Sequence, residues 1–131
     1  MSRSNVEIAR RAYAAINAGD IDTALECVHP EIEWHMSHRF EEGRVFHGHD
    51  GVREVFGMFL AMLDDFRAEP KEFIDAGDKV MVRVRLCGKE KTGGEDAAYD
   101  LVQVWTARDG KAARLDVYDT RAEALRSLGV T

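Results

Sequence analysis

The last third of the chain carries polar side chains that suit a small-molecule site: arginines, a glutamine and an aspartate. They stand at every second position of three segments between residues 79 and 119, among Met, Leu, Tyr and Trp residues. Because successive side chains of a strand point to opposite faces, we expect these groups on one face of a sheet. A mostly apolar surface with a few placed polar groups is typical of a pocket wall. The members of this expected face are Met81, Arg83, Arg85, Cys87, Tyr99, Leu101, Gln103, Trp105, Arg114, Asp116 and Tyr118.

Asp116 and Arg83 both fall on this expected face, where an acid and an arginine can act as a pair. An arginine beside a carboxylate in a dry pocket keeps the carboxylate ionised and orients it, so that it can accept a proton from a substrate or a water. The alternative is a structural ion pair between neighbouring strands, which perturbs a carboxylate in the same way.

His38 is a further candidate acid or base, because its alternation places it with Trp34 and Met36 and because imidazole titrates near neutral pH. Other histidines lie nearby in the sequence, and a zinc ion needs three or four converging ligands. His35 and His38 are expected on opposite faces of their strand. We therefore expect solvated or pocket-lining histidines, no metal site and no cofactor.

Aromatic residues form a candidate set for stacking against a ligand. In a small domain such residues are more often core, which is the alternative. The N–H of Trp and the O–H of Tyr need partners when buried, and this favours a cavity with polar groups over a dry core. The candidates are Trp34, Phe59, Tyr99, Trp105 and Tyr118.

Composition excludes several classes of protein. The 131 residues fit a single domain, residues 1–131, and are enough to bury a core. A net charge of −6 without a basic cluster argues against a nucleic-acid partner. The sequence has no apolar run of membrane-spanning length and no signal-peptide core, so we expect no membrane partner and a cytoplasmic location. Cys27 and Cys87 are expected as buried thiols.

Helix and strand signals along the chain show which elements position these groups. Capping boxes begin helices at Ser4 and Thr120, Asp20 and Asp50 are expected to cap two more, and Gly77 and Gly110 mark hairpin turns. The expected order is a helix over 5–18, a helix ending before Pro30, a strand over 31–38, a helix after residue 50, four strands between 66 and 119, and a short terminal helix. Helices segregated from strands indicate an α+β fold, with helices packed on one face of a curved, mostly antiparallel sheet.

Four segments resemble signatures of the nuclear transport factor 2-like superfamily. Their sequence pattern is most similar to that of its SnoaL-like, polyketide cyclase-like branch. They are residues 11–22, with their helix–Gly-Asp–helix pattern, residues 46–56, residues 75–80 and residues 104–111. The resemblance implies a cone of sheet around three N-terminal helices, an internal pocket for a small, largely apolar molecule, and a homodimer through the sheet. It leaves open an isomerase, a cyclase, a hydrolase or a non-catalytic binding or dimerisation module.

Two catalytic patterns within this superfamily are matched in part. Residues 115–119 resemble the last strand of limonene-epoxide-hydrolase-like proteins, which implies a catalytic Asp116 assisted by Arg83, although Arg85 stands where that family has a second acid. In the ketosteroid-isomerase-like pattern the base falls near Met36, or at His35 with a one-residue slip, and the oxyanion tyrosine falls near Ala12, so both groups of that pattern are missing. Tyr13 is a donor at the next position, but rotation by one residue of a helix changes its direction by about 100°.

The opposite alternation of the same strands is made of valine and leucine. If the polar face lines the cone, this second face points outward, where it would form a large apolar patch unless another chain covers it. We therefore expect it to be the dimer surface. Its members are Val80, Val82, Val84, Leu86, Val102, Val104, Leu115 and Val117.

Overall fold

The computed structural model describes residues 4–36 and 44–129. In this part of the chain six strands form one curved sheet in the order β2-β1-β6-β5-β4-β3, in which β1 and β6 are parallel and the other neighbours are antiparallel. The strands are β1 (Val28–His35), β2 (Val45–His47), β3 (Leu63–Ala76), β4 (Lys79–Glu90), β5 (Asp96–Arg108) and β6 (Lys111–Tyr118).

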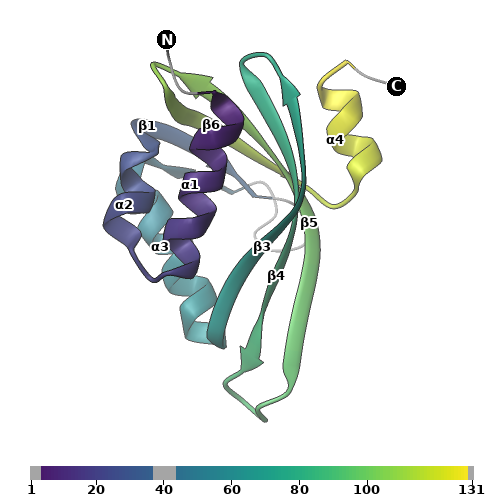
Figure 1. Ribbon diagram of the computed structural model, residues 1–131. Coiled ribbons are helices and arrows are strands. Elements are labelled where there is room, and N and C mark those ends of the chain that lie inside the picture. Colours follow the sequence, from purple (N-terminus) through teal and green to yellow (C-terminus); the bar gives the residue numbers. More distant parts are fainter. Residues whose placement is uncertain (1–3, 37–43, 130–131) are drawn as a thin grey trace.

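Three helices cover one side of this sheet and the fourth lies on the opposite side (Figure 1). The first three are α1 (Asn5–Asn17), α2 (Ile21–Glu26) and α3 (Gly48–Met62), and the last is α4 (Arg121–Ser127). The strands curve around α1 to α3, so the expectation of an α+β fold with helices on a curved, mostly antiparallel sheet is confirmed.

Both capping boxes begin helices where they were expected. The Ser4 hydroxyl accepts a hydrogen bond from the backbone N–H of Glu7 at 3.2 Å, and Thr120 does the same for Glu123 at 3.2 Å. The third helix differs from its prediction, because α3 follows β2 directly at Gly48 and its N-cap, His47, makes no side-chain cap bond. Asp50 therefore lies inside the helix rather than before it.

Pro30 lies inside β1, so the strand begins earlier than expected. Its pairing with β6 shifts between Val28 and Glu33, which places Pro30 in an irregular stretch of the ladder. Proline cannot donate a ladder hydrogen bond, and bulges are among the places where a sheet tolerates it. The helix before it consequently ends at Glu26.

The residues of β4, β5 and β6 that share a face of the sheet are not those that the sequence predicted to share one. Gln103 pairs with Val82 of β4 and with Val117 of β6, so all three share one face. Asp116 pairs with Val104 on the other face. The expectation that Arg83, Gln103 and Asp116 lie together is therefore wrong, although the alternation within each strand is correct.

The inner face packs on the helices of the same chain. It carries most of the valines that were expected outside, together with the mixed residues of β5, and it forms the main core. Its sheet residues are Val80, Val82, Val84, Leu86, Leu101, Gln103, Trp105, Leu115 and Val117. These valines are therefore not an outward dimer surface, because α1 to α3 already cover them.

A second, smaller cluster lies on the outer face beneath α4. Met81, Val102 and Val104 meet Ala124 there, and none of them is more than 3% exposed. The outer apolar patch that a sheet of this pattern would leave is thus covered by the terminal helix.

Candidate functional site

An aromatic cavity of about 40 Å³ lies between the helices and the inner face of the sheet. Its lining comes from α1, α2, α3 and all strands except β2 and β6. Five of the residues predicted to bind a ligand are among the residues around it: Tyr13, Trp34, Phe59, Gln103 and Trp105. The other lining residues are Ala12, Ile16, Ala24, Val28, Val52, Phe56, Phe66, Ala68 and Leu86.

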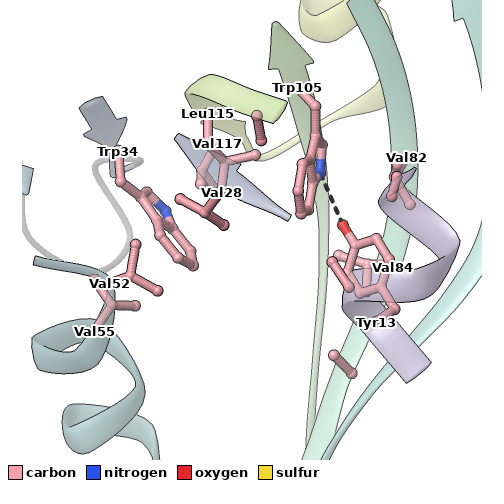
Figure 2. Close-up of a cluster of buried hydrophobic side chains, with 14 of the residues drawn as sticks. Tyr13, Val28, Trp34, Val52, Val55, Val82, Val84, Trp105, Leu115 and Val117 are labelled. Carbon is pink, nitrogen blue, oxygen red and sulfur yellow. Dashed lines mark hydrogen bonds between the residues drawn. The ribbon is translucent and has the colours of Figure 1, made fainter. Parts of the chain in front are cut away.

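Tyr13 lies at the centre of the only polar cluster in this cavity lining, as far as the described residues show. Its hydroxyl donates a hydrogen bond to Oε1 of Gln103. It also accepts one from Nε1 of Trp105 at 3.1 Å, which Figure 2 shows. The ring of Trp105 meets the ring of Tyr13 edge-on at 5.5 Å. Tyr13 comes from α1, and Gln103 and Trp105 come from β5. Their hydrogen bonds therefore depend on how the helix packs across the sheet.

Burial strongly raises the pKa of Tyr13, and the hydrogen bond from Trp105 acts in the opposite direction with a smaller effect. The side chain is 3% exposed, so its anion would lose nearly all contact with water. At neutral pH Tyr13 is therefore an uncharged donor and acceptor. Its single proton is donated to Gln103, so toward a ligand the hydroxyl offers only its remaining acceptor lone pair.

Trp34 lies across the hydrophobic cluster from Trp105 (Figure 2). Its ring packs edge-on against Phe56 at 5.9 Å, and the residue is 7% exposed. Within the described part of the chain, its indole N–H is a buried donor without a hydrogen-bond acceptor. A buried donor left in this way costs roughly 1–3 kcal/mol.

A larger hollow of about 580 Å³ adjoins the cavity and is called the mouth below. The two share Ile16, Phe56 and Phe66, which stand between them. The remaining residues of the mouth come from the α1–α2 connection and from the outward side of α3. They are Asn17, Ala18, Gly19, Ile21, Arg53, Gly57 and Leu60.

The sequence analysis did not identify the mouth, although a signal for it exists. Arg53, Phe56, Gly57 and Leu60 are spaced i, i+3, i+4 and i+7, which is one side of a helix. This stripe runs beside the stronger apolar stripe that packs into the core. Its charged and glycine members made it inconspicuous, yet it is the side of α3 that borders the mouth.

Other predicted ligand contacts lie away from the cavity. Leu101 and Tyr99 belong to the inner face or pack against its core, but they do not line the cavity. Tyr118 packs against the outer cluster beneath α4. His38 lies outside the described residues.

The charged candidates lie on the outer face and pair with other residues than expected. Asp116 accepts two hydrogen bonds from the guanidinium of Arg114, at 2.9 and 3.0 Å. Arg83 lies 3.5 Å from Glu72. Asp116 is therefore not paired with Arg83, and neither residue reaches the cone cavity.

Arg85 also forms an outer ion pair. Its guanidinium donates two hydrogen bonds to Asp100, at 2.8 and 3.2 Å. Asp116 itself borders a separate hollow of about 240 Å³, which His35 and Glu123 also line. The polar residues that were expected to form one wall thus divide between the two faces of the sheet.

The described residues contain no group of three or more His, Cys, Asp or Glu side chains placed to hold a metal ion. His49 Nε2 lies 2.8 Å from the carbonyl oxygen of Val28, and His35 Nε2 lies 3.1 Å from Glu33. Among the helices of residues 4–36 and 44–129, none combines the length and the apolar character that crossing a bilayer requires.

Solved structures similar to this one span nearly the whole chain. TerC, crystallised together with polyporic acid, is 30% identical, with a TM-score of 0.77 over 95% of this chain and 98% of that one. A nuclear transport factor 2-like protein of unknown function from Burkholderia pseudomallei K96243 is 25% identical, with a TM-score of 0.77 over 93% and 95% of the two chains. A similar protein from Burkholderia thailandensis E264 is 23% identical, with a TM-score of 0.79 over 96% and 98%, and shows the fold alone.

No curated protein matches this sequence significantly. The SnoaL-like domain family, in contrast, matches residues 9–115, which include most of α1, the whole of α2 and α3, and most of the sheet. The topology, the helices inside the curved sheet and the aromatic cavity agree with that match. The chain belongs to the SnoaL-like domain family.

Proposed function

We propose that the protein binds a small, largely apolar molecule in the cone, with a hydrogen-bond acceptor of that molecule directed at the indole N–H of Trp34. The observation that carries the proposal is this buried donor, which has no acceptor among the described residues although it borders a cavity. An oxygen of a ligand would supply the missing acceptor and recover part of the cost of burying the N–H.

The rest of the lining supports an apolar, flat ligand. Phe56, Phe59 and Phe66 present aromatic surface along the path from the mouth to the cavity. Phe59 and Phe66 already stack, with centroids 5.4 Å apart. Aromatic walls with a few polar groups are the usual composition of sites for such molecules. TerC, 30% identical and crystallised with polyporic acid, makes that compound a reasonable first ligand to test.

The inner cavity alone has room for only a few water molecules or one small chemical group. The body of the ligand therefore belongs in the mouth, and only its tip enters the cone. At that tip, Tyr13 and Gln103 offer a second hydrogen-bonding point on the side of Trp105. The distribution of space and polar atoms thus orients the ligand.

Binding, rather than proton transfer, is the activity that this geometry supports. Of the described residues that line the cavity, none is a carboxylate, a histidine or a lysine. Tyr13 remains uncharged and its only proton is donated to Gln103, so it is no general base at neutral pH. The candidate acid Asp116 lies on the outer face.

Calorimetric titration with polyporic acid tests the proposal. Trp34→Phe removes the N–H and keeps an aromatic ring, so we expect binding about tenfold weaker, the equivalent of about 1.4 kcal/mol. Tyr118→Phe is the control, because it removes a polar atom from the outer face. Urea unfolding curves are needed first to check that both variants are folded. If Trp34→Phe binds polyporic acid as tightly as the wild-type protein does, Trp34 does not hold the ligand. If the wild-type protein binds neither polyporic acid nor the neutral aromatic amine N-phenyl-1-naphthylamine, the whole proposal fails.

The homodimer, which rests on the family resemblance, and the cytoplasmic location, which rests on the composition of the sequence, stay proposals. The outer sheet face beside α4 carries ion pairs, including Arg83 with Glu72 and Arg85 with Asp100, so a dimer through it would be polar. We therefore expect its association to weaken with salt. Sedimentation at micromolar concentration in low and high salt tests this, and a monomer in both would overturn it.

A further inference from the structure

We propose that the ligand is an amphipathic acid whose anionic group is held by Arg53 at the mouth while its apolar body points into the cone. This inference rests on the proposed function and names the class of molecule that the same site accepts. The acidic group can be a carboxylate, a sulfonate or an acidic hydroxyl, because a guanidinium binds each of these through the same charge-assisted hydrogen bonds.

Arg53 is the charged residue among apolar neighbours in this hollow. Ile21, Phe56 and Leu60 line the mouth with it, and no other described lining residue of the mouth or the cavity bears a charge. The side chain of Arg53 is 52% exposed, so an incoming anion can reach it. Next to an apolar wall, a charge is screened less than on an open surface.

The guanidinium of Arg53 has no close partner in the described residues. Its nearest carboxylates, Asp22 and Asp50, lie at 4.0 and 3.9 Å, and both are almost fully exposed. In contrast, Arg85 and Arg114 hold their carboxylates at 2.8 and 2.9 Å. Hydrogen-bonding capacity of Arg53 thus remains for a ligand, whereas that of the outer arginines is used within the chain.

The helix that carries Arg53 also gives access to the cone. Gly57 lies one turn further along the same side of α3, and a Cβ built there meets no atom within 4 Å. Its backbone is helical, so glycine is not required for the conformation. Leu60, 53% exposed, continues the same stripe. A ligand with its acid on Arg53 would therefore lie along the open space beside Gly57.

A matched pair of fluorescent probes separates charge from apolar binding. 8-Anilinonaphthalene-1-sulfonate and N-phenyl-1-naphthylamine share a skeleton and differ by the sulfonate. We expect Arg53→Gln to weaken binding of the sulfonate about fivefold and to leave the neutral probe nearly unchanged. Arg83→Gln, with the same change in net charge on the outer face, should affect neither probe.

A second pair of variants tests access. Gly57→Leu should weaken both probes at least about tenfold, because the new side chain fills the space beside the aromatic wall, and replacing a helical glycine does not cost stability. Ala122→Leu adds a comparable group at an exposed position of α4, which lines neither the mouth nor the cavity, and should weaken neither probe.

The outcomes distinguish the two proposals. If Gly57→Leu weakens both probes while Arg53→Gln weakens both equally or neither, Arg53 does not recognise an anion, and cone binding stands. If Arg53→Gln acts selectively on the sulfonate but Gly57→Leu changes nothing, the anion binds outside the cone and the inference is overturned. If neither probe binds the wild-type protein, the proposed function fails with it.

Discussion

The side-chain amide of Asn17 forms two hydrogen bonds with the backbone of Ala68. Its Nδ2 donates to the carbonyl oxygen at 2.8 Å, and its Oδ1 accepts from the backbone N–H at 2.8 Å. Asn17 ends α1 and Ala68 belongs to β3, so one side chain ties the last turn of the helix to the sheet beside the mouth. The backbone groups that it satisfies are partly buried and belong to the edge strand of the sheet.

Asn17→Ala should therefore lower the free energy of unfolding by about 1–3 kcal/mol, because both backbone groups of Ala68 lose their partner. Asn5→Ala is the matched control, since the Asn5 amide makes one exposed hydrogen bond to the carbonyl of Gly77. We expect the control to cost clearly less in urea unfolding curves. If both variants lose the same free energy of unfolding, the two hydrogen bonds of Asn17 stabilise the fold no more than the single exposed bond of Asn5.

Tyr13→Phe should cost about 1–3 kcal/mol at neutral pH, since Gln103 and Trp105 lose their shared partner inside the core. The pKa of Tyr13 is raised by burial, so the neutral phenol is favoured in the folded chain. Its contribution to stability is fully present below the unfolded pKa of about 10 and is lost as pH rises above it. Urea unfolding from about pH 9 to about pH 11 should thus reduce the difference between wild type and Tyr13→Phe. A constant difference would contradict the assignment.

Glu72 gives a pH dependence of the opposite sign. Its pKa is lowered, chiefly by the hydrogen bonds from Arg121 and also by the charge of Arg121 and by Arg83, so the ionised form is favoured in the folded chain. The stabilisation is therefore present above the unfolded pKa of about 4.3 and is lost as pH falls through the lower folded value.

Glu72→Gln should lower the melting temperature slightly near neutral pH, and the difference should disappear in acid. Arg121 begins α4, so the loss should be local to the docking of this helix. Glu26→Gln, which removes an exposed partner of Arg11, is the control and should have little effect near neutral pH. Persistence of the Glu72→Gln difference in acid would show that packing, and not charge, is responsible.

Asp116→Asn tests the residue that the sequence favoured as a catalytic group. Asp116 is 18% exposed and bonded to Arg114 on the outer face, so we expect a loss of about 1 kcal/mol or less in the free energy of unfolding. Binding of N-phenyl-1-naphthylamine in the cone should be unchanged. Weaker binding of this probe would place Asp116 within reach of the ligand and would contradict the face assignment.

Local chemistry made most elements predictable. The Ser4 and Thr120 caps, the positive φ of Gly77 and Gly110 at the hairpins, and the apolar stripe of α3 are each determined by residues close in sequence. Five cavity residues were also predicted: Tyr13, Trp34, Phe59, Gln103 and Trp105. Four of them are aromatic and carry large apolar surface, and all except Phe59 have polar atoms that need partners when buried. These features depend little on how distant segments pair.

The combination of strands into faces was not predictable, because it depends on single-residue shifts in register. The tight turn pairs Arg108 with Lys111, and continuing that register would place Gln103 opposite Asp116. The ladder instead shifts between Thr106 and Ala107, after which Gln103 pairs with Val117. One additional residue in β6 thus turns Asp116 to the outer face, since a shift by one residue reverses every side chain that follows. The sequence contains no glycine that marks this bulge.

Ala124→Glu should destabilise the protein strongly, because Ala124 is fully buried in the outer cluster beneath α4. We expect a loss of several kcal/mol in urea unfolding, given the cost of burying an unpaired charge. Ala122→Glu introduces the same residue on an exposed position of the same helix and should change stability by less than about 0.5 kcal/mol. Similar losses in both variants would show that α4 does not need this contact.

The position of α4 has a consequence for how the protein is made. Every strand of the sheet precedes Thr120, so a growing chain has the whole sheet available before the helix that covers Met81, Val102 and Val104 emerges. During that interval the apolar residues on the outer face of the nascent sheet are exposed to solvent. In a chain that stops near residue 119 they would stay exposed and favour aggregation. Docking of α4 thus removes from solvent an apolar surface of the kind through which incompletely folded chains associate.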